Sequence, residues 1–201
     1  NYIHMGREAI ARGTEEPPFA WLVPPDQRDP GSAYEMITRL RATGIEVHLA
    51  TAEFTADGVT YPAGTYIMYC AQPYRPHLMD MMERQVYPDR EQYPGGPAEQ
   101  PYDMAGWTLP LQMGVRHLAV SGPFEADARL LDDLAYPQGT RSGEANPEYW
   151  MVHPGHNDFY RLLARLHGQG VKFSLFAGDR AIIPQAEQAL AQLAGAAAPQ
   201  P

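Results

Sequence analysis

The densest group of side chains that could do chemistry is His153-Pro-Gly-His156, followed directly by Asn157 and Asp158. It lies between an apolar run and a helical pattern, so we expect a strand-to-helix loop. Two imidazoles and a carboxylate suit zinc, and an open zinc site needs only three protein ligands. The intervening Pro-Gly gives loop geometry, however, without the shared helical face of an HExxH motif. Asn157 or Asp158 is also well placed to cap the next helix. Capping with solvated histidines is therefore the favoured interpretation, and we predict no metal site.

A second candidate loop, Pro24-Pro25-Asp26-Gln27-Arg28-Asp29, follows the apolar run Phe19 to Val23. It lacks the glycines that let a backbone approach a pyrophosphate. Arg28 could clamp a carboxylate or a phosphate, with Gln27 beside it. An exposed Arg–Asp pair within the loop is the more ordinary outcome.

The third candidate is the segment from Cys70 to Arg75, where a predicted strand meets a predicted helix. A nucleophile on such a turn needs small neighbours, but Tyr69, Ala71 and Gln72 surround this cysteine. A free, buried cysteine that acts as a small hydrophobe is the favoured alternative. The ligand-binding candidates at the strand ends are then Gln27, Arg28, Gln72, Arg75, His153, His156 and Asn157, and we predict no catalytic residue.

A repeated pattern must position these loops. Each copy has an apolar strand, a loop, an amphipathic helix closed by glycine and a second strand; the copies span 19–49 and 149–175. Two strand–helix–strand units predict a parallel sheet covered by helices, with ligand loops at the carboxyl ends of its strands. We therefore expect an α/β fold, a flavodoxin-like three-layer sandwich with a mostly parallel sheet.

Other local patterns complete the expected domain. We expect a hairpin around 59–61, strands at 65–70 and 116–120, and helices at 76–85, 125–134 and 184–193. Residues 86–110 form a Pro-rich, aromatic excursion. Its rings either pack on the domain surface, which is the favoured interpretation, or dock on a neighbouring domain.

The composition disfavours two classes of function, nucleic-acid binding and membrane insertion. The chain has 201 residues, and 15 Lys and Arg against 24 Asp and Glu give a net charge of −9. That balance disfavours nucleic acid, whose binding depends on basic groups. The sequence contains no long apolar run and no basic amphipathic helix, so it does not predict membrane insertion.

The ends suggest a piece of a longer protein. The chain opens on Asn1, and 1–12 has the pattern of a helix that lacks its beginning. We expect 1–18 to be a helix tail and linker from an upstream domain, 19–194 to be the α/β domain, and 195–201 to be a flexible tail.

Four stretches carry a resemblance: PPFAWLVPPDQRD (17–29), LRATGIEV (40–47), TADGVTYPAGTYIMYCAQPYRP (55–76) and QPYDMAGWTLPLQMGV (100–115). Together they resemble the segment after the peptidase domain in bacterial M14-type zinc-carboxypeptidase-like proteins. That segment looks like a class I glutamine-amidotransferase-like domain. The resemblance covers roughly 1–176 and implies a parent that removes C-terminal residues, holds zinc in an upstream peptidase domain and is periplasmic or secreted.

The zinc ligands of that family cannot be assigned here, because no histidine is followed by glutamate three residues later. No amidotransferase triad can be assigned either, since Cys70 has no elbow and no His-x-Glu partner. The resemblance therefore predicts a non-catalytic accessory domain, without a cofactor of its own, that packs on the peptidase module of the same polypeptide. The alternative is an amidotransferase-like hydrolase or small-ligand-binding domain that uses the strand-end loops.

Overall fold

The computed structural model describes residues 1–84, 86, 90–100, 108–139, 142–143, 147–176 and 180–184. The chain divides into two compact units. Unit 1 comprises Asn1–Pro25 and Met36–Leu131, and unit 2 comprises Asp26–Glu35 and Asp132–Pro201.

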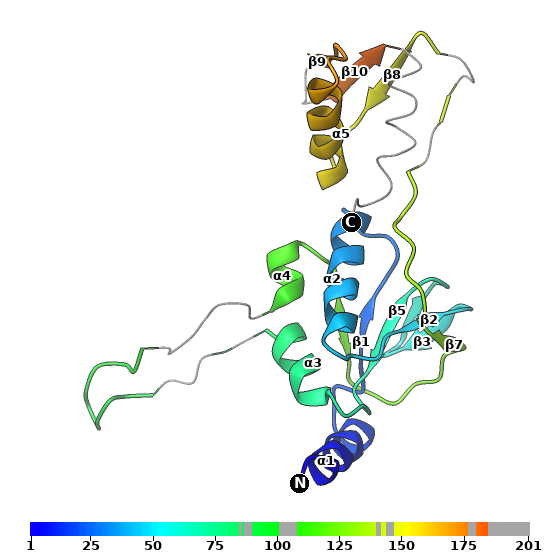
Figure 1. Cartoon of the computed structure of the whole chain (residues 1–201). Coiled ribbons are helices and arrows are strands. Elements are labelled where there is room, and N and C mark those ends of the chain that lie inside the picture. Colours follow the sequence, from blue (N-terminus) through cyan, green and yellow to red (C-terminus); the bar gives the residue numbers. More distant parts are fainter. Residues whose placement is uncertain are drawn as a thin grey trace. The chain divides into compact units, whose positions relative to one another are not determined.

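A five-stranded sheet forms the centre of unit 1, in the order β6-β1-β5-β2-β7 (Figure 1). Each described neighbour pair is antiparallel. The strands are β1 (Ala20–Val23), β2 (His48–Ala50), β5 (Tyr66–Tyr69), β6 (Leu118–Val120) and β7 (Ala128–Leu130). All four residues of β1 are buried, as expected of a strand covered on both faces.

Different elements cover the two faces of this sheet. On one face, Leu22 and Ile67 join a core with the hairpin of β3 (Phe54–Ala56) and β4 (Val59–Tyr61). On the other face, Trp21, Val23 and Met68 are buried on the side where the helices lie (Figure 1). These helices are α2 (Pro30–Ala42, of which Met36–Ala42 belongs to unit 1), α3 (Arg75–Met82) and α4 (Leu109–Met113). Met36, Ile37, Leu40, Leu78 and Met82 are their buried apolar side chains.

Helix α1 (Tyr2–Glu15) packs closely on the turn that follows β5. A Cβ atom at Gly13 would overlap the backbone carbonyl of Cys70, so only glycine fits at this contact. Ala9, one turn earlier, is also buried. The predicted N-terminal helix is confirmed, and it extends three residues further, to Glu15.

Unit 2 contains a three-stranded antiparallel sheet in the order β8-β10-β9. Its strands are β8 (Tyr149–Val152), β9 (Ser174–Phe176) and β10 (Arg180–Pro184), and helix α5 (Asn157–Gly168) joins β8 to β9. Leu162 and Leu166 of α5 pack with Ile183 of β10. Helix α5 therefore covers one face of this sheet (Figure 1).

The expectation of a flavodoxin-like fold with a mostly parallel sheet is wrong, because the described strand pairs are antiparallel. Both strand–helix–strand copies form locally, as β1-α2-β2 and β8-α5-β9, but each has a later strand inserted antiparallel between its two strands. These inserted strands are β5 and β10. Leu22 and Met151 also lie in different sheets, so the copies do not build one sheet. The crossover pattern shows that β1 and β2 run the same way, but not that they are neighbours.

One further expectation fails for a local reason. The expected helix at 125–134 does not form; this segment contains the edge strand β7, which pairs with β2. The residues Phe124, Ala126 and Ala128 alternate and pack on the core, a strand period that outweighs helix propensity. Pro184, the first residue of the expected closing helix, is the last residue of β10. The rest of the expected helix, 185–193, and the tail 195–201 lie outside the described residues.

Candidate functional site

The polar network of unit 2 centres on Asp29, which directly precedes α2. Its carboxylate accepts hydrogen bonds from the N–H groups of Gly31 (3.0 Å) and Ser32 (3.3 Å) and from Ser32 Oγ (2.9 Å). Pro30 at the first helical position lacks an N–H and is preset for the helix. Asp29 is therefore the N-cap of α2.

The same carboxylate also serves the start of α5. Asn157 N–H donates to Asp29 Oδ2 (3.1 Å), and Asn157 Nδ2 donates to Ser32 Oγ (3.2 Å). The residue at the N-cap of α5, His156, makes no side-chain cap bond. The cap expected from Asn157 or Asp158 thus comes from Asp29, which ties the first turns of two helices together.

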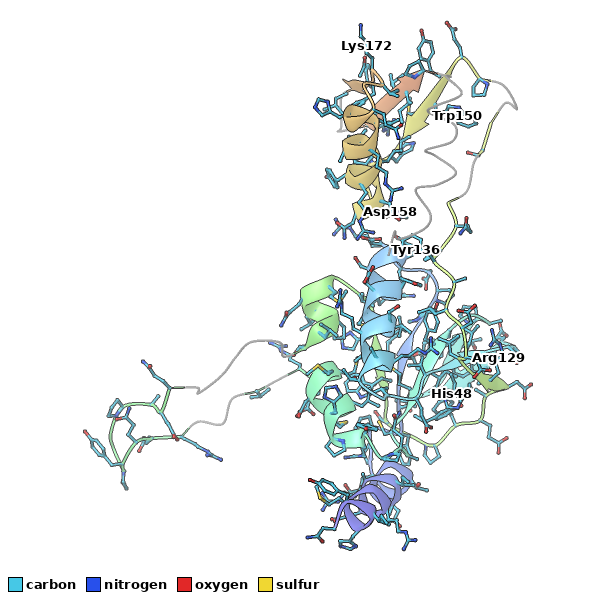
Figure 2. The ribbon with its side chains drawn as sticks, viewed as in Figure 1. His48, Arg129, Tyr136, Trp150, Asp158 and Lys172 are labelled. Atoms are coloured by element: carbon cyan, nitrogen blue, oxygen red, sulfur yellow. The ribbon has the colours of Figure 1, made fainter. Side chains whose placement is uncertain are left out.

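A second carboxylate completes the network. The Tyr136 hydroxyl lies 2.7 Å from both oxygens of Asp158. Arg161 Nη1 donates to Asp158 Oδ1 (3.1 Å) and to the Tyr136 oxygen (3.3 Å). Tyr136 also contacts Tyr34 of α2 edge-on, with ring centroids 4.9 Å apart. Figure 2 labels Tyr136 and Asp158, which meet at the first turn of α5.

The environment of Asp29 keeps its carboxyl group ionised at neutral pH, and the environment of Tyr136 keeps its phenol neutral. Burial alone would raise the pKa of Asp29, but hydrogen bonds from Asn157 and Ser32, with the charge of His156, bring it below 3.8. Burial, followed by the hydrogen bond to Asp158, raises the pKa of Tyr136 far above its usual value of 10. An ionised cap and a neutral phenol are suited to holding helices together, whereas a general acid or base needs a pKa near the working pH.

The two candidate histidines lie apart from this bonding. The side chains of both His153 and His156 are exposed. Within the described parts of the chain, no group of three or more His, Cys, Asp or Glu side chains is placed to hold a metal ion. Of the predicted residues in the two loops, Asn157 joins the network through hydrogen bonds to Asp29 and Ser32; Gln27 is half-buried and Arg28 is exposed.

The remaining candidates lie in unit 1, and Gln72 has a structural role there. Its buried amide donates to the carbonyls of Tyr69 (2.7 Å) and Glu46 (3.2 Å) and accepts from Glu46 N–H (2.8 Å). It therefore ties the end of β5 to the segment that leads into β2. All these bonds are to backbone, so the amide is fixed by the fold.

Cys70 is fully buried next to Gln72. Burial raises the pKa of its thiol to about 11, although the positive charge of Arg75 opposes this. A thiol with this pKa is not a ready nucleophile at neutral pH. Arg75 begins α3, and its buried Nε has no hydrogen-bond partner among the described residues.

The sequence interpretation missed five residues of the network: Asp29 as a cap, Ser32, Tyr136, Asp158 as an acceptor, and Arg161. The string Asp29-Pro-Gly-Ser32 does contain a signature of a helix start, a capping side chain followed by proline. Asp158 and Arg161 are spaced for an i, i+3 pair. No local pattern marks Tyr136, because its partner is 22 residues away.

Comparison with models of known protein families, with curated proteins and with solved structures finds no match to this sequence. None of the helices in the described regions is both long and apolar enough to span a bilayer.

Proposed function

We propose that this chain is a non-catalytic accessory domain of an M14-type zinc-carboxypeptidase-like protein. It binds the peptidase module of the same polypeptide, in part through α1. The zinc belongs to that upstream module, and the parent is exported to the periplasm or the medium. The resemblance of four stretches within 17–115 supports the parent's class.

The observation that carries the proposal is the surface of α1. The helix buries only a narrow stripe at Ala9 and Gly13. Apolar side chains continue beyond this stripe: Tyr2, Ile3 and Met5 are 89%, 74% and 61% exposed. An apolar arc wider than the stripe that the fold buries is typical of a helix that packs against a further surface.

The polar groups of the chain support an accessory role as well. Asp29, Asp158 and Gln72 are engaged by backbone and side-chain donors of the fold itself. The zinc-ligand pattern that a carboxypeptidase needs has no counterpart in this sequence.

The first test is the coding sequence upstream of Asn1 in the source organism. We expect a His-x-x-Glu pair, a more distant third histidine and a catalytic glutamate in a preceding peptidase domain. A different upstream domain would overturn the proposal. So would release of C-terminal amino acids by this chain alone in a chelator-sensitive reaction, and hydrolysis of free glutamine would favour the amidotransferase-like alternative.

The second test measures binding of the chain to the separately produced peptidase module by titration calorimetry. Ile3→Asp combined with Met5→Asp should weaken binding about tenfold or more, because it places charges in an apolar contact. His4→Asp introduces one negative charge on the polar side of α1 and should change the affinity by about twofold or less. Equal effects of the two variants would show that the apolar arc is not the contact.

A further inference from the structure

A row of stacked aromatic rings lies on the face of the unit 1 sheet that the β3–β4 hairpin covers. Phe54 stacks on Tyr61 and on Phe124, with ring centroids 5.5 and 5.6 Å apart. Phe124 stacks in turn on Tyr69, at 5.7 Å. His48 of β2 contacts the Tyr69 ring edge-on, at 5.1 Å. A side chain that can ionise near neutral pH therefore ends a row of four aromatic rings.

The surroundings of the His48 imidazole suit a neutral ring. The side chain is half-buried, and its buried Nδ1 has no hydrogen-bond partner in the part of the chain that the structure describes. An imidazolium donates from both nitrogens, so protonation would leave a buried, charged N–H group without an acceptor. Burial accordingly lowers the pKa of His48 below its usual 6.5, although the charge of Glu46 opposes this.

The neighbouring strands give an imidazolium little compensation. Glu46 precedes His48 on the same face of β2, but its charge has a smaller effect on the pKa of His48 than burial has. Strand β5 contributes the phenol of Tyr69, which is neutral because burial raises its pKa above the usual 10. On β7, Leu130 pairs directly with His48. Arg129 of the same strand (Figure 2) pairs with the next residue of β2 and so lies on the opposite face.

We propose that His48 is an acid-sensitive switch, whose protonation in mild acid releases the edge strand β7 from the sheet of unit 1. Strand β7 pairs with β2 over three residues, and Leu130 opposite His48 is 49% exposed. Strands β2 and β5, in contrast, each pair with a neighbour on both sides. A charged imidazole gains hydration by turning away from the Tyr69 ring, which removes the packing beside Leu130. The strand with the fewest partners then separates first.

Titration of the full, unmodified chain by NMR tests the protonation step. The imidazole C–H signal that disappears in His48→Phe identifies His48, and His48→Gln provides a second neutral replacement for the same purpose. In the folded chain this signal should titrate with a midpoint below pH 6.5. A midpoint at or above this value would show that Glu46 or the Tyr69 ring stabilises the imidazolium, and it would overturn the proposal.

Hydrogen exchange followed by mass spectrometry tests the release of β7. Between about pH 7.5 and about pH 5, protection of the amides in 124–131, corrected for the intrinsic exchange rate, should fall at least about threefold. Protection of the central strand β1 should not change. His48→Phe keeps an uncharged ring beside Tyr69 and should leave 124–131 protected at both pH values. His4→Gln removes an exposed histidine of α1 and should leave the fall unchanged.

Two results of the exchange experiment would overturn the proposal. Equal loss of protection in 124–131 and in β1 would show that acid destabilises the whole unit and does not release one strand. The same fall in both neutral variants of His48 as in the unmodified chain would assign the response to another group. Circular dichroism at about pH 7.5 confirms that each variant is folded before its exchange is compared.

Discussion

The two strand–helix–strand copies share a motif and differ in how completely the fold covers it. In unit 1 the motif is β1-α2-β2 with β5 inserted, and in unit 2 it is β8-α5-β9 with β10 inserted. The first strands even align as Trp21-Leu-Val23 and Trp150-Met-Val152. At the equivalent central positions, Leu22 is fully buried, whereas Met151 is half-exposed.

Elements outside the motif account for this difference. In unit 1, the β3–β4 hairpin and the segment 124–128 cover the sheet face that contains Leu22. Among the described residues of unit 2, no counterpart covers the face that contains Met151. The local pattern thus specifies a helix packed on a split pair of strands, and the flanking sequence decides whether the second face becomes a core.

The largest expected effect on stability comes from truncating the equivalent residues Leu22 and Met151 to alanine. Leu22→Ala removes a fully buried side chain from the core between the sheet and the β3–β4 hairpin. It should lower the free energy of unfolding by about 3 kcal/mol. Met151→Ala should cost only about 0.5 kcal/mol, because the side chain of Met151 is half-exposed. Urea denaturation measures both variants, and similar large losses would show that the two units are equally covered.

The next effect sharpens the comparison at α1, which adds a layer to unit 1. Gly13→Ala introduces a Cβ that overlaps the Cys70 carbonyl, so it should cost about 2 kcal/mol through displacement of the helix. Gly6→Ala is the matched control in the same helix, since its Cβ would meet only Pro73 Cβ, at 3.7 Å. Alanine favours a helix over glycine, so Gly6→Ala should stabilise by about 0.5 to 1 kcal/mol. Thermal unfolding should therefore shift in opposite directions, and destabilisation by both variants would contradict the close approach at Gly13.

The sequence predicts elements well where their cause is local. The helix α2 has a proline start and a glycine end, and β1 is one apolar run; both are where the pattern indicates. Pairing between strands is not local, because β5 and β10 insert between strands that precede them in the chain. The run Ala181-Ile-Ile183 could have identified β10, since consecutive apolar and β-branched residues favour a strand.

In the candidate site, too, local features could be predicted from the sequence, whereas contacts between distant residues could not. The capping potential of Asp29 is visible in its own four-residue string, but its bond to Asn157 spans 128 residues and depends on the tertiary fold. The loop residues selected for their chemistry, such as Arg28 and His153, are exposed. A loop's composition shows which groups are available, whereas the packing of the helix starts decides which of them meet.

The smallest effect tests whether one carboxylate links the two helix starts of unit 2. Asp29→Ala removes the cap of α2 and the acceptor for Asn157 N–H, and should cost about 1 to 2 kcal/mol at pH 7. Asp29→Asn keeps an acceptor oxygen and should cost less. Asp133→Asn, at an exposed position of the same unit, controls for the loss of one negative charge.

The pH dependence separates the charge of Asp29 from its shape. Its pKa in the folded chain lies below 3.8, so the folded state favours the ionised carboxylate relative to the unfolded chain. The stability from this group is therefore complete above pH 3.8 and is lost as the pH falls through the lower folded pKa. Between about pH 5 and pH 3, unfolding free energies of the unmodified chain should fall more steeply than those of Asp29→Asn. Parallel curves would show that the neighbouring N–H groups and His156 do not favour the ionised form, and that the two helix starts are held by other contacts.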